Sequence, residues 1–182
     1  GDSAEQATSD SGGTFEEIEI GTYRYIFNMK VPSGYDQNAT HTIGYYAERN
    51  LEEWELGAPM DDGVVNFVPS GGEVQKIREI VTNEACANCH DPLRIHGRRH
   101  SYELCITCHY DGVIDPDTGN TVDFKVMVHK IHYGEELPSV QAGIPYQIIG
   151  FRQSVHDYSE VAFPQDHRNC ETCHAEEASQ YE

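Results

Sequence analysis

Basic residues are scarce in this chain of 182 residues, where 12 Lys and Arg stand against 31 Asp and Glu for a formal net charge of −19. Nucleic-acid binding requires clustered basic side chains, so this scarcity excludes that class of function. No apolar run approaches the length of a membrane span, and no basic segment leads into a short apolar one as in a signal peptide. An acidic surface favours solubility, and it also suits cationic partners, metal ions included.

Cysteine is absent outside three short strings, each of the form Cys-x-x-Cys-His. The six cysteines that they use are Cys86, Cys89, Cys105, Cys108, Cys170 and Cys173. This spacing is typical of c-type haem attachment, in which both thiols add to porphyrin vinyl groups and the histidine ligates the iron. The sequence therefore predicts three haems c, with His90, His109 and His174 as the proximal ligands.

Zinc sites and disulfides are the alternative uses of paired cysteines. Six cysteines would make one and a half four-cysteine zinc sites, and neither alternative explains a histidine directly after every second cysteine. Three strings that use every cysteine favour haem strongly over both alternatives.

Apolar residues make up only 38% of the chain, which is low for a self-sufficient core. Porphyrin faces bury as large aromatic surfaces do, so we expect the C-terminal half to depend on its cofactors for folding. Because haem is attached to such motifs outside the cytoplasm, we also expect an exported protein whose signal segment has been removed.

The chain divides into three parts by composition and pattern. Residues 1–13 are small, polar and acidic and predict a flexible tether. Residues 14–81 predict a small antiparallel β domain, with strand patterns at Thr22–Met29, His41–Glu48 and Val64–Val68. Residues 82–182 predict a turn-rich, partly helical domain with three haems, which makes the fold class α+β.

One helix in the haem part is well marked. Asp123 is a typical N-cap, the segment Phe124–Tyr133 carries an apolar stripe, and Gly134 is a typical stop. Further on, Tyr146–Phe151 and Tyr158–Phe163 are candidates for a small hairpin.

Seven histidines remain after the proximal ligands, and bis-histidine ligation needs three of them. His129 and His132, three residues apart on the predicted helix, can face two different irons. His96 precedes Gly97, which lets the backbone pass close to a large planar group. The other four are His100 and His156, which are alternative distal ligands, and His41 and His167, which we expect at the surface.

A calcium loop is a further possibility at Asp115–Asp123, where oxygen-bearing side chains alternate. The segment lacks the closing Glu and contains Pro116, so an ordinary turn that leads into the Asp123 cap is the stronger interpretation.

With these residues in place, the chain resembles the OmcA/MtrC family of outer-membrane multihaem cytochromes from metal-reducing bacteria. The matching strings are GTYRYIF (21–27), THTIG (40–44), CANCHDPLRIHG (86–97), FKVMVHKIHYG (124–134) and FPQDHRNCETCH (163–174). The resemblance implies extracellular electron transfer through closely stacked bis-His haems, with a β domain packed beside a haem domain. It also favours His96, His129 and His132 as distal ligands.

Haem number is where the chain departs from the family. Members typically carry about ten haems in two β-plus-haem halves, whereas three motifs follow one β part here. We therefore expect a unit of a longer path, which docks with other cytochromes or with copies of itself and passes electrons to acceptors such as metal oxides. In a polymer of copies, a neighbouring subunit could supply a distal ligand, and His41 would then be reconsidered.

Two functions of different classes follow. An electron carrier needs closed, six-coordinate irons, whereas a reductase of a small oxyanion or metal ion needs one open iron flanked by acid/base and anion-binding groups. Arg94, Arg98, Arg99 and His100 are the residues that could serve a reductase. Because spare histidines outnumber the open positions, the sequence favours an electron-transfer protein at the outer cell surface over an enzyme.

Overall fold

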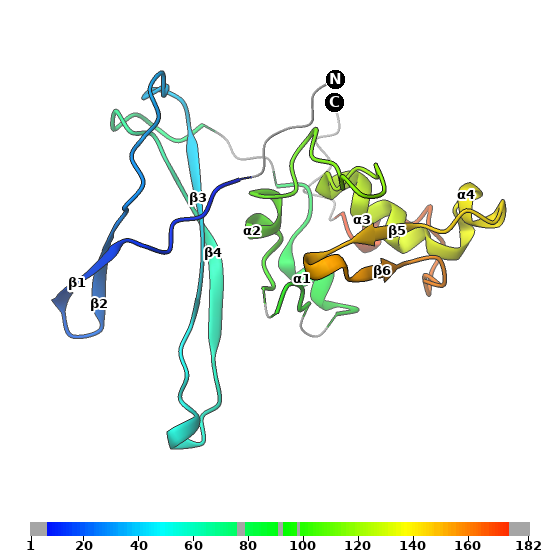
Figure 1. The fold of residues 1–182 in the computed structure, drawn as a ribbon, viewed down its shortest axis with the longest axis horizontal. Helices are drawn as coiled ribbons and strands as arrows, with labels where there is room; N and C mark the ends of the chain where they lie inside the picture. The colour runs from blue at the N-terminus through cyan, green and yellow to red at the C-terminus, as the bar shows by residue number, and fades with distance from the viewer. Residues whose placement is uncertain (1–6, 76–78, 91–92, 98, 175–182) are drawn as a thin grey trace.

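The computed structural model describes residues 7–75, 79–90, 93–97 and 99–174. A short β-hairpin and a long one form the N-terminal part, and short helices joined by turns form the C-terminal part beside them (Figure 1). This is the mixed α+β arrangement that the sequence predicts. No helix among the described residues is long and apolar enough to cross a membrane.

The first hairpin joins β1 (Thr14–Glu19) to β2 (Thr22–Ile26) in antiparallel register, with a β-bulge between Glu17 and Glu19. Alternation along β2 brings aromatic rings together, since the Tyr25 ring lies 4.8 Å from that of Phe15 and 5.1 Å from that of Phe27. Asp10 accepts hydrogen bonds from the Tyr25 hydroxyl and the Met29 amide. The segment predicted as a tether is therefore attached to this hairpin at Asp10.

The second hairpin joins β3 (His41–Glu48) to β4 (Met60–Phe67), paired without a break from His41–Phe67 to Glu48–Met60. The bounds of β3 match the prediction, whereas β4 begins four residues before the predicted Val64. The extra residues pair with the far end of β3, so the partner strand determines the length of β4. The two hairpins are separate two-stranded sheets, not one sheet.

The C-terminal part contains the short helices α1 (Asn83–Ala87) and α2 (Tyr102–Ile106), the longer α3 (Phe124–Tyr133) and the single turn α4 (Pro138–Gln141). Helix α3 has its predicted bounds: the Asp123 carboxylate accepts from the Lys125 amide, and Gly134 ends the helix. Three 3-10 turns, at Gly134–Glu136, Phe151–Gln153 and Cys170–Thr172, complete this part, and a fourth, Glu52–Trp54, lies at the tip of the second hairpin.

A third, smaller hairpin joins β5 (Gln147–Ile149) to β6 (Val155–Asp157). The predicted second strand, Tyr158–Phe163, is therefore wrong. The chain reverses through Arg152 and Gln153, both in the left-handed region of backbone conformation, so β6 pairs earlier than the hydrophobic pattern suggests. Strand β6 ends at Asp157. Just after it, the Tyr158 amide donates to the Tyr146 carbonyl, and the Ser159 hydroxyl accepts from the Tyr146 amide.

Buried apolar side chains are few. Among the described residues they are Val68, Tyr102, Leu104, Val113, Val122, Leu137 and Tyr146. Most of them lie in the C-terminal part, between the second and third motifs and around α3. The β1–β2 hairpin contributes none of them.

Candidate haem sites

The three Cys-x-x-Cys-His strings adopt the same local structure. In each, the histidine amide donates to the carbonyl of the first cysteine four residues earlier, at 2.9 Å, and the second cysteine amide donates to that same carbonyl. The result is one tight helical turn, which brings both sulfur atoms and the imidazole to one region of space. All six cysteines are free of disulfides.

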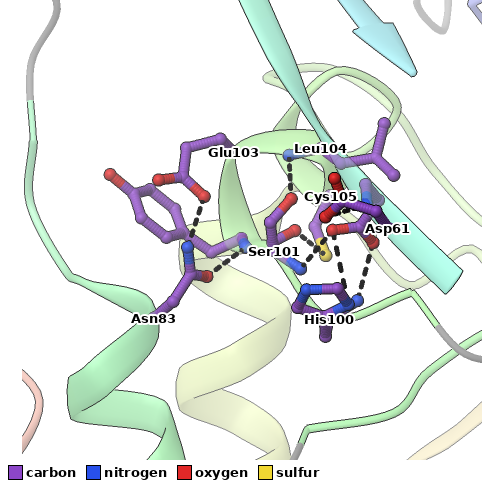
Figure 2. A network of polar contacts seen from close by, with 9 residues as sticks. Asp61, Asn83, His100, Ser101, Glu103, Leu104 and Cys105 are labelled. Atoms are coloured by element: carbon purple, nitrogen blue, oxygen red, sulfur yellow. Dashed lines mark hydrogen bonds and ion pairs between the residues drawn. The ribbon is translucent and has the colours of Figure 1, made fainter. Parts of the chain in front are cut away.

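The first two motifs are held by helix caps. Thr82 caps α1 by accepting from the Ala85 amide, and Ser101 caps α2 by accepting from the Leu104 amide. Asn83 joins the two helices: its side chain accepts from the Tyr102 amide and donates to the Glu103 carboxylate, both at 2.8 Å (Figure 2). The first and second motifs therefore form one connected unit.

The β3–β4 hairpin is tied to the second motif by a buried carboxylate. Asp62 on β4 has a fully buried side chain that accepts from the His100 amide at 2.7 Å and the Ser101 amide at 3.1 Å. The His100 ring also lies 3.5 Å from the Asp62 carboxylate. Since Ser101 caps α2, this one side chain determines where the helix with Cys105 begins relative to the hairpin. No sequence signal marked Asp62, because an acidic residue in a strand is ordinarily exposed.

Helix α3 carries two of the predicted distal histidines. Both rings lean back along the helix, as the Nδ1 of His129 donates to the Lys125 carbonyl and the Nδ1 of His132 donates to the Val128 carbonyl. Three residues separate them, so the rings leave the helix in neighbouring directions.

The structure brings each proximal histidine to one of the three preferred distal histidines. The ring centroids of His90 and His132, of His109 and His96, and of His174 and His129 are each 6.0 Å apart. In contrast, the stacked rings of Tyr35 and His41 are only 4.1 Å apart. The three histidine pairs are thus too far apart for direct stacking and are equally spaced.

A metal ion between two imidazole nitrogens fits this spacing. Metal–nitrogen bonds of about 2 Å on each side, plus roughly 1 Å from each nitrogen to its ring centre, separate the centroids by about 6 Å. Each pair supplies two protein ligands, which is what a haem iron requires, because the porphyrin provides the other four. The donor set and its spacing therefore fit haem.

Hydrogen bonds hold the rings in the tautomer that ligation requires. Besides His129 and His132, the Nδ1 of His109 donates to the Val122 carbonyl at 2.8 Å and that of His174 donates to the Ile80 carbonyl at 2.9 Å. A ring that donates from Nδ1 keeps the Nε2 lone pair free for a metal, and the bond to the carbonyl fixes its orientation.

Comparison with known proteins identifies the family. Residues 78–182, more than half of the chain, match the family described as outer membrane cytochrome MtrC/MtrF-like, domains II/IV. The chain belongs to this family of outer membrane cytochromes. The cofactor class that the family and the motifs share is c-type haem.

Two individual relatives extend the match into the β part. The multihaem cytochrome MtrC of Shewanella baltica (strain OS185) is 29% identical over 154 residues, which are 78% of this chain and 22% of that protein. The crystal structure of the outer membrane decahaem cytochrome OmcA superposes with a TM-score of 0.71 at 27% identity, over 96% of this chain and 30% of that one. The chain thus spans less than a third of either relative.

Within the part that the structure describes, no group of three or more His, Cys, Asp or Glu side chains is arranged to hold a metal ion. Calcium does not fit the segment Asp115–Asp123, because the Asp115 carboxylate is buried and already accepts from the Asp117 and Ile149 amides and the Thr118 hydroxyl. That segment is an ordinary turn, as its sequence favours.

His96 is presented by a tight turn. His96 and Gly97 both have positive φ, between the paired backbones of Ile95 and Arg99. An added Cβ at Gly97 meets nothing within 4 Å in the chain, so the turn itself accounts for glycine there. Burial lowers the pKa of His96, and the nearby His109 adds to this effect, so both favour the neutral ring.

The other histidines have different partners. His100 faces Asp62, as described, and the Nε2 of His156 lies 3.0 Å from the Ser154 hydroxyl. The Nε2 of His41 donates to the Asp36 carbonyl. His167, expected at the surface, is half-buried, and its Nε2 donates to the His132 carbonyl at 3.1 Å.

Three of the motif cysteines have shifted thiols. Burial raises the pKa of the Cys105 thiol to about 11, and burial also raises the pKa of Cys86 and of Cys173.

Proposed function

We propose that this chain conducts electrons through three covalently attached haems c, each ligated by two histidines. The ligand pairs are His90 with His132, His109 with His96, and His174 with His129. The observation that carries the proposal is the common 6.0 Å spacing of these three ring pairs. His156 and His100 are the alternative distal ligands, and both have other partners.

An iron whose six coordination positions are all filled suits electron transfer. Haem iron supplies the reversible one-electron change, and the protein adjusts it through axial ligands, hydrogen bonds and burial. The Nδ1 bonds of His109, His129, His132 and His174 end on backbone carbonyls. Because backbone acceptors keep their place in both oxidation states, the rings need little rearrangement when an electron arrives or leaves.

The thiol positions support an order for the three sites. Cys86 lies near Cys173, which raises its pKa, and near Cys105, whose pKa it raises in turn. Helix α3 also supplies a ligand to both the first and the third motif. We infer that the first motif lies between the second and the third, which makes a path of three adjacent haems.

The path is proposed as one part of a longer one at the extracellular face of the cell. The chain spans 22% of the MtrC relative and 30% of the OmcA chain, which is described as decahaem. Other multihaem cytochromes or copies of this chain would continue the path, and external acceptors such as metal oxides would take the electrons. Electron microscopy and sedimentation of the holoprotein test this part, and a monodisperse monomer that exchanges no electrons with a multihaem cytochrome would contradict it.

Exogenous ligands distinguish conduction from catalysis. With all irons closed, carbon monoxide added to the reduced protein, or nitrite to the oxidised protein, leaves the Soret spectrum unchanged. A reductase would bind one equivalent without displacing a histidine. The groups suggested for that role have other contacts, since Arg99 lies over the Tyr46 ring and His100 pairs with Asp62. Arg98 lies outside the described residues.

A further inference from the structure

The three histidine pairs differ in the angle between their rings. His96 and His109 are 9° from parallel and His129 and His174 are 19° from parallel, whereas His90 and His132 are crossed at 71°. The centroid distance is the same in all three pairs, whereas the angle between the ring planes differs.

Phe163 and His167 hold the His132 ring. The Phe163 ring meets the His132 ring edge-on, at 86° and a centroid distance of 5.6 Å, and its centroid lies 5.2 Å from that of His167. His167 in turn donates to the His132 carbonyl at 3.1 Å and lies 3.3 Å from the Glu136 carboxylate. The Tyr133 ring also lies 4.5 Å from that of His167. We call Phe163 and His167 the His132 clamp.

Rotation of His132 toward parallel is opposed from two sides. It would break the 2.9 Å bond from Nδ1 to the Val128 carbonyl, and it would turn the ring against Phe163. His129 makes the same kind of bond to the carbonyl four residues earlier. The helix alone therefore does not distinguish the two rings, and the clamp is what His132 has in addition.

Ring angle matters to an iron held between two imidazoles. Parallel rings donate π density into the same iron d orbital and split it from its partner, whereas crossed rings address both orbitals and leave them nearly degenerate. The low-spin ferric resonance is then a rhombic three-line signal for parallel rings and a strongly anisotropic signal with a large maximal g for crossed rings. Ligand orientation set by surrounding groups is one of the means by which a protein tunes its metal.

We propose that Phe163 is a positioning residue, which keeps the His90–His132 pair crossed and so makes one of the three haems electronically distinct. This inference rests on the proposed bis-His ligation and adds the identity of the distinct site and the residue that sets it. The His167 ring packs against the Phe163 ring and so supports its position.

Electron paramagnetic resonance of the oxidised holoprotein tests the proposed role of Phe163. We expect two rhombic signals and one large-g signal of equal spin. Phe163→Leu should convert or shift the large-g signal and leave the rhombic ones, while Phe151→Leu, a matched change at a ring that is 84% exposed, should change nothing. Three rhombic signals in the wild type, or an unchanged large-g signal in Phe163→Leu, would overturn the inference.

A second pair of variants distinguishes an effect on the His132 ring from a loss of folding. His167→Leu removes the bond to the His132 carbonyl, and His167→Gln keeps a donor there, so the large-g signal should shift in the first and return toward wild type in the second. Equal spectra for the two would count against the clamp. Haem content by pyridine haemochrome, together with the spin state from optical spectra of the native protein, separates the two proposals, because three low-spin haems without a large-g signal overturn the clamp and leave the conduction proposal standing.

Discussion

The rings of His96 and His109 are nearly parallel, with centroids 6.0 Å apart, although one lies in a tight turn and the other ends a helical motif. His96, in the segment between the first and second motifs, thus lies opposite the histidine of the second motif. The same segment ends at the Asp62 contact, which fixes the start of α2.

Removal of a distal ligand should open one iron. In His96→Ala we expect about one third of the haem to become high-spin and to bind carbon monoxide when reduced. Optical spectra with and without carbon monoxide measure the high-spin fraction and the binding of carbon monoxide. His156→Ala is the matched control and should leave all haem low-spin; if it opens an iron and His96→Ala does not, the assignment is wrong.

Loss of the Asp62 charge should weaken the attachment of the β3–β4 hairpin to α2. Asp62→Asn keeps the size but weakens the acceptor for two backbone amides in a buried place, so we expect a loss of about 1–3 kcal/mol in unfolding free energy. Urea titration followed by fluorescence and Soret absorbance measures it. Asp61→Asn, at an exposed neighbour, should cost less than about 0.5 kcal/mol. Equal effects of the two would show that the contact is not specific.

Gly134 should tolerate no side chain. Its φ is 41°, and an added Cβ would lie 2.0 Å from the Val161 carbonyl oxygen, which is held by the Glu135 amide. Gly134→Ala should therefore cost about 1–3 kcal/mol more than Gly143→Ala, where φ is also positive but no atom lies within 4 Å. Thermal unfolding of the holoproteins compares them, and equal losses would contradict the close contact.

Asp115 should make stability depend on pH in the acid range. Burial raises its pKa, but hydrogen bonds from Thr118, Ile149 and Asp117 outweigh burial and hold the pKa below its ordinary value. A lowered folded pKa gives stability that is present above the unfolded value of about 3.9 and is lost as the pH falls through the folded value. Asp115→Asn should therefore be less stable than wild type at pH 7, and the gap should close as the pH falls toward 3. A gap that is constant with pH would contradict this.

Local sequence signals predicted what depends on short segments. The Asp123 cap and the Gly134 stop predicted the bounds of α3. The pairing of distal with proximal histidines involves distant segments, yet the i, i+3 spacing of His129 and His132 was sufficient to suggest two different partners.

Residues whose roles come from tertiary contacts were missed. No local pattern predicted the roles of Asp62 and Phe163, because each role comes from a contact with a distant segment of the chain. His167 lies beside Arg168, which suggested a surface position, but the chain folds it onto the His132 carbonyl. The hairpin of β5 and β6 was misplaced because left-handed Arg152 and Gln153 are not typical turn residues.

Near-infrared magnetic circular dichroism of the oxidised holoprotein tests the central claim most directly, because the energy of the low-spin charge-transfer band reports the axial ligand pair. With haem content fixed by pyridine haemochrome, the account predicts three haems per chain, each with a bis-histidine band. A high-spin fraction near one third, a band from another ligand pair, or fewer than three haems would contradict it.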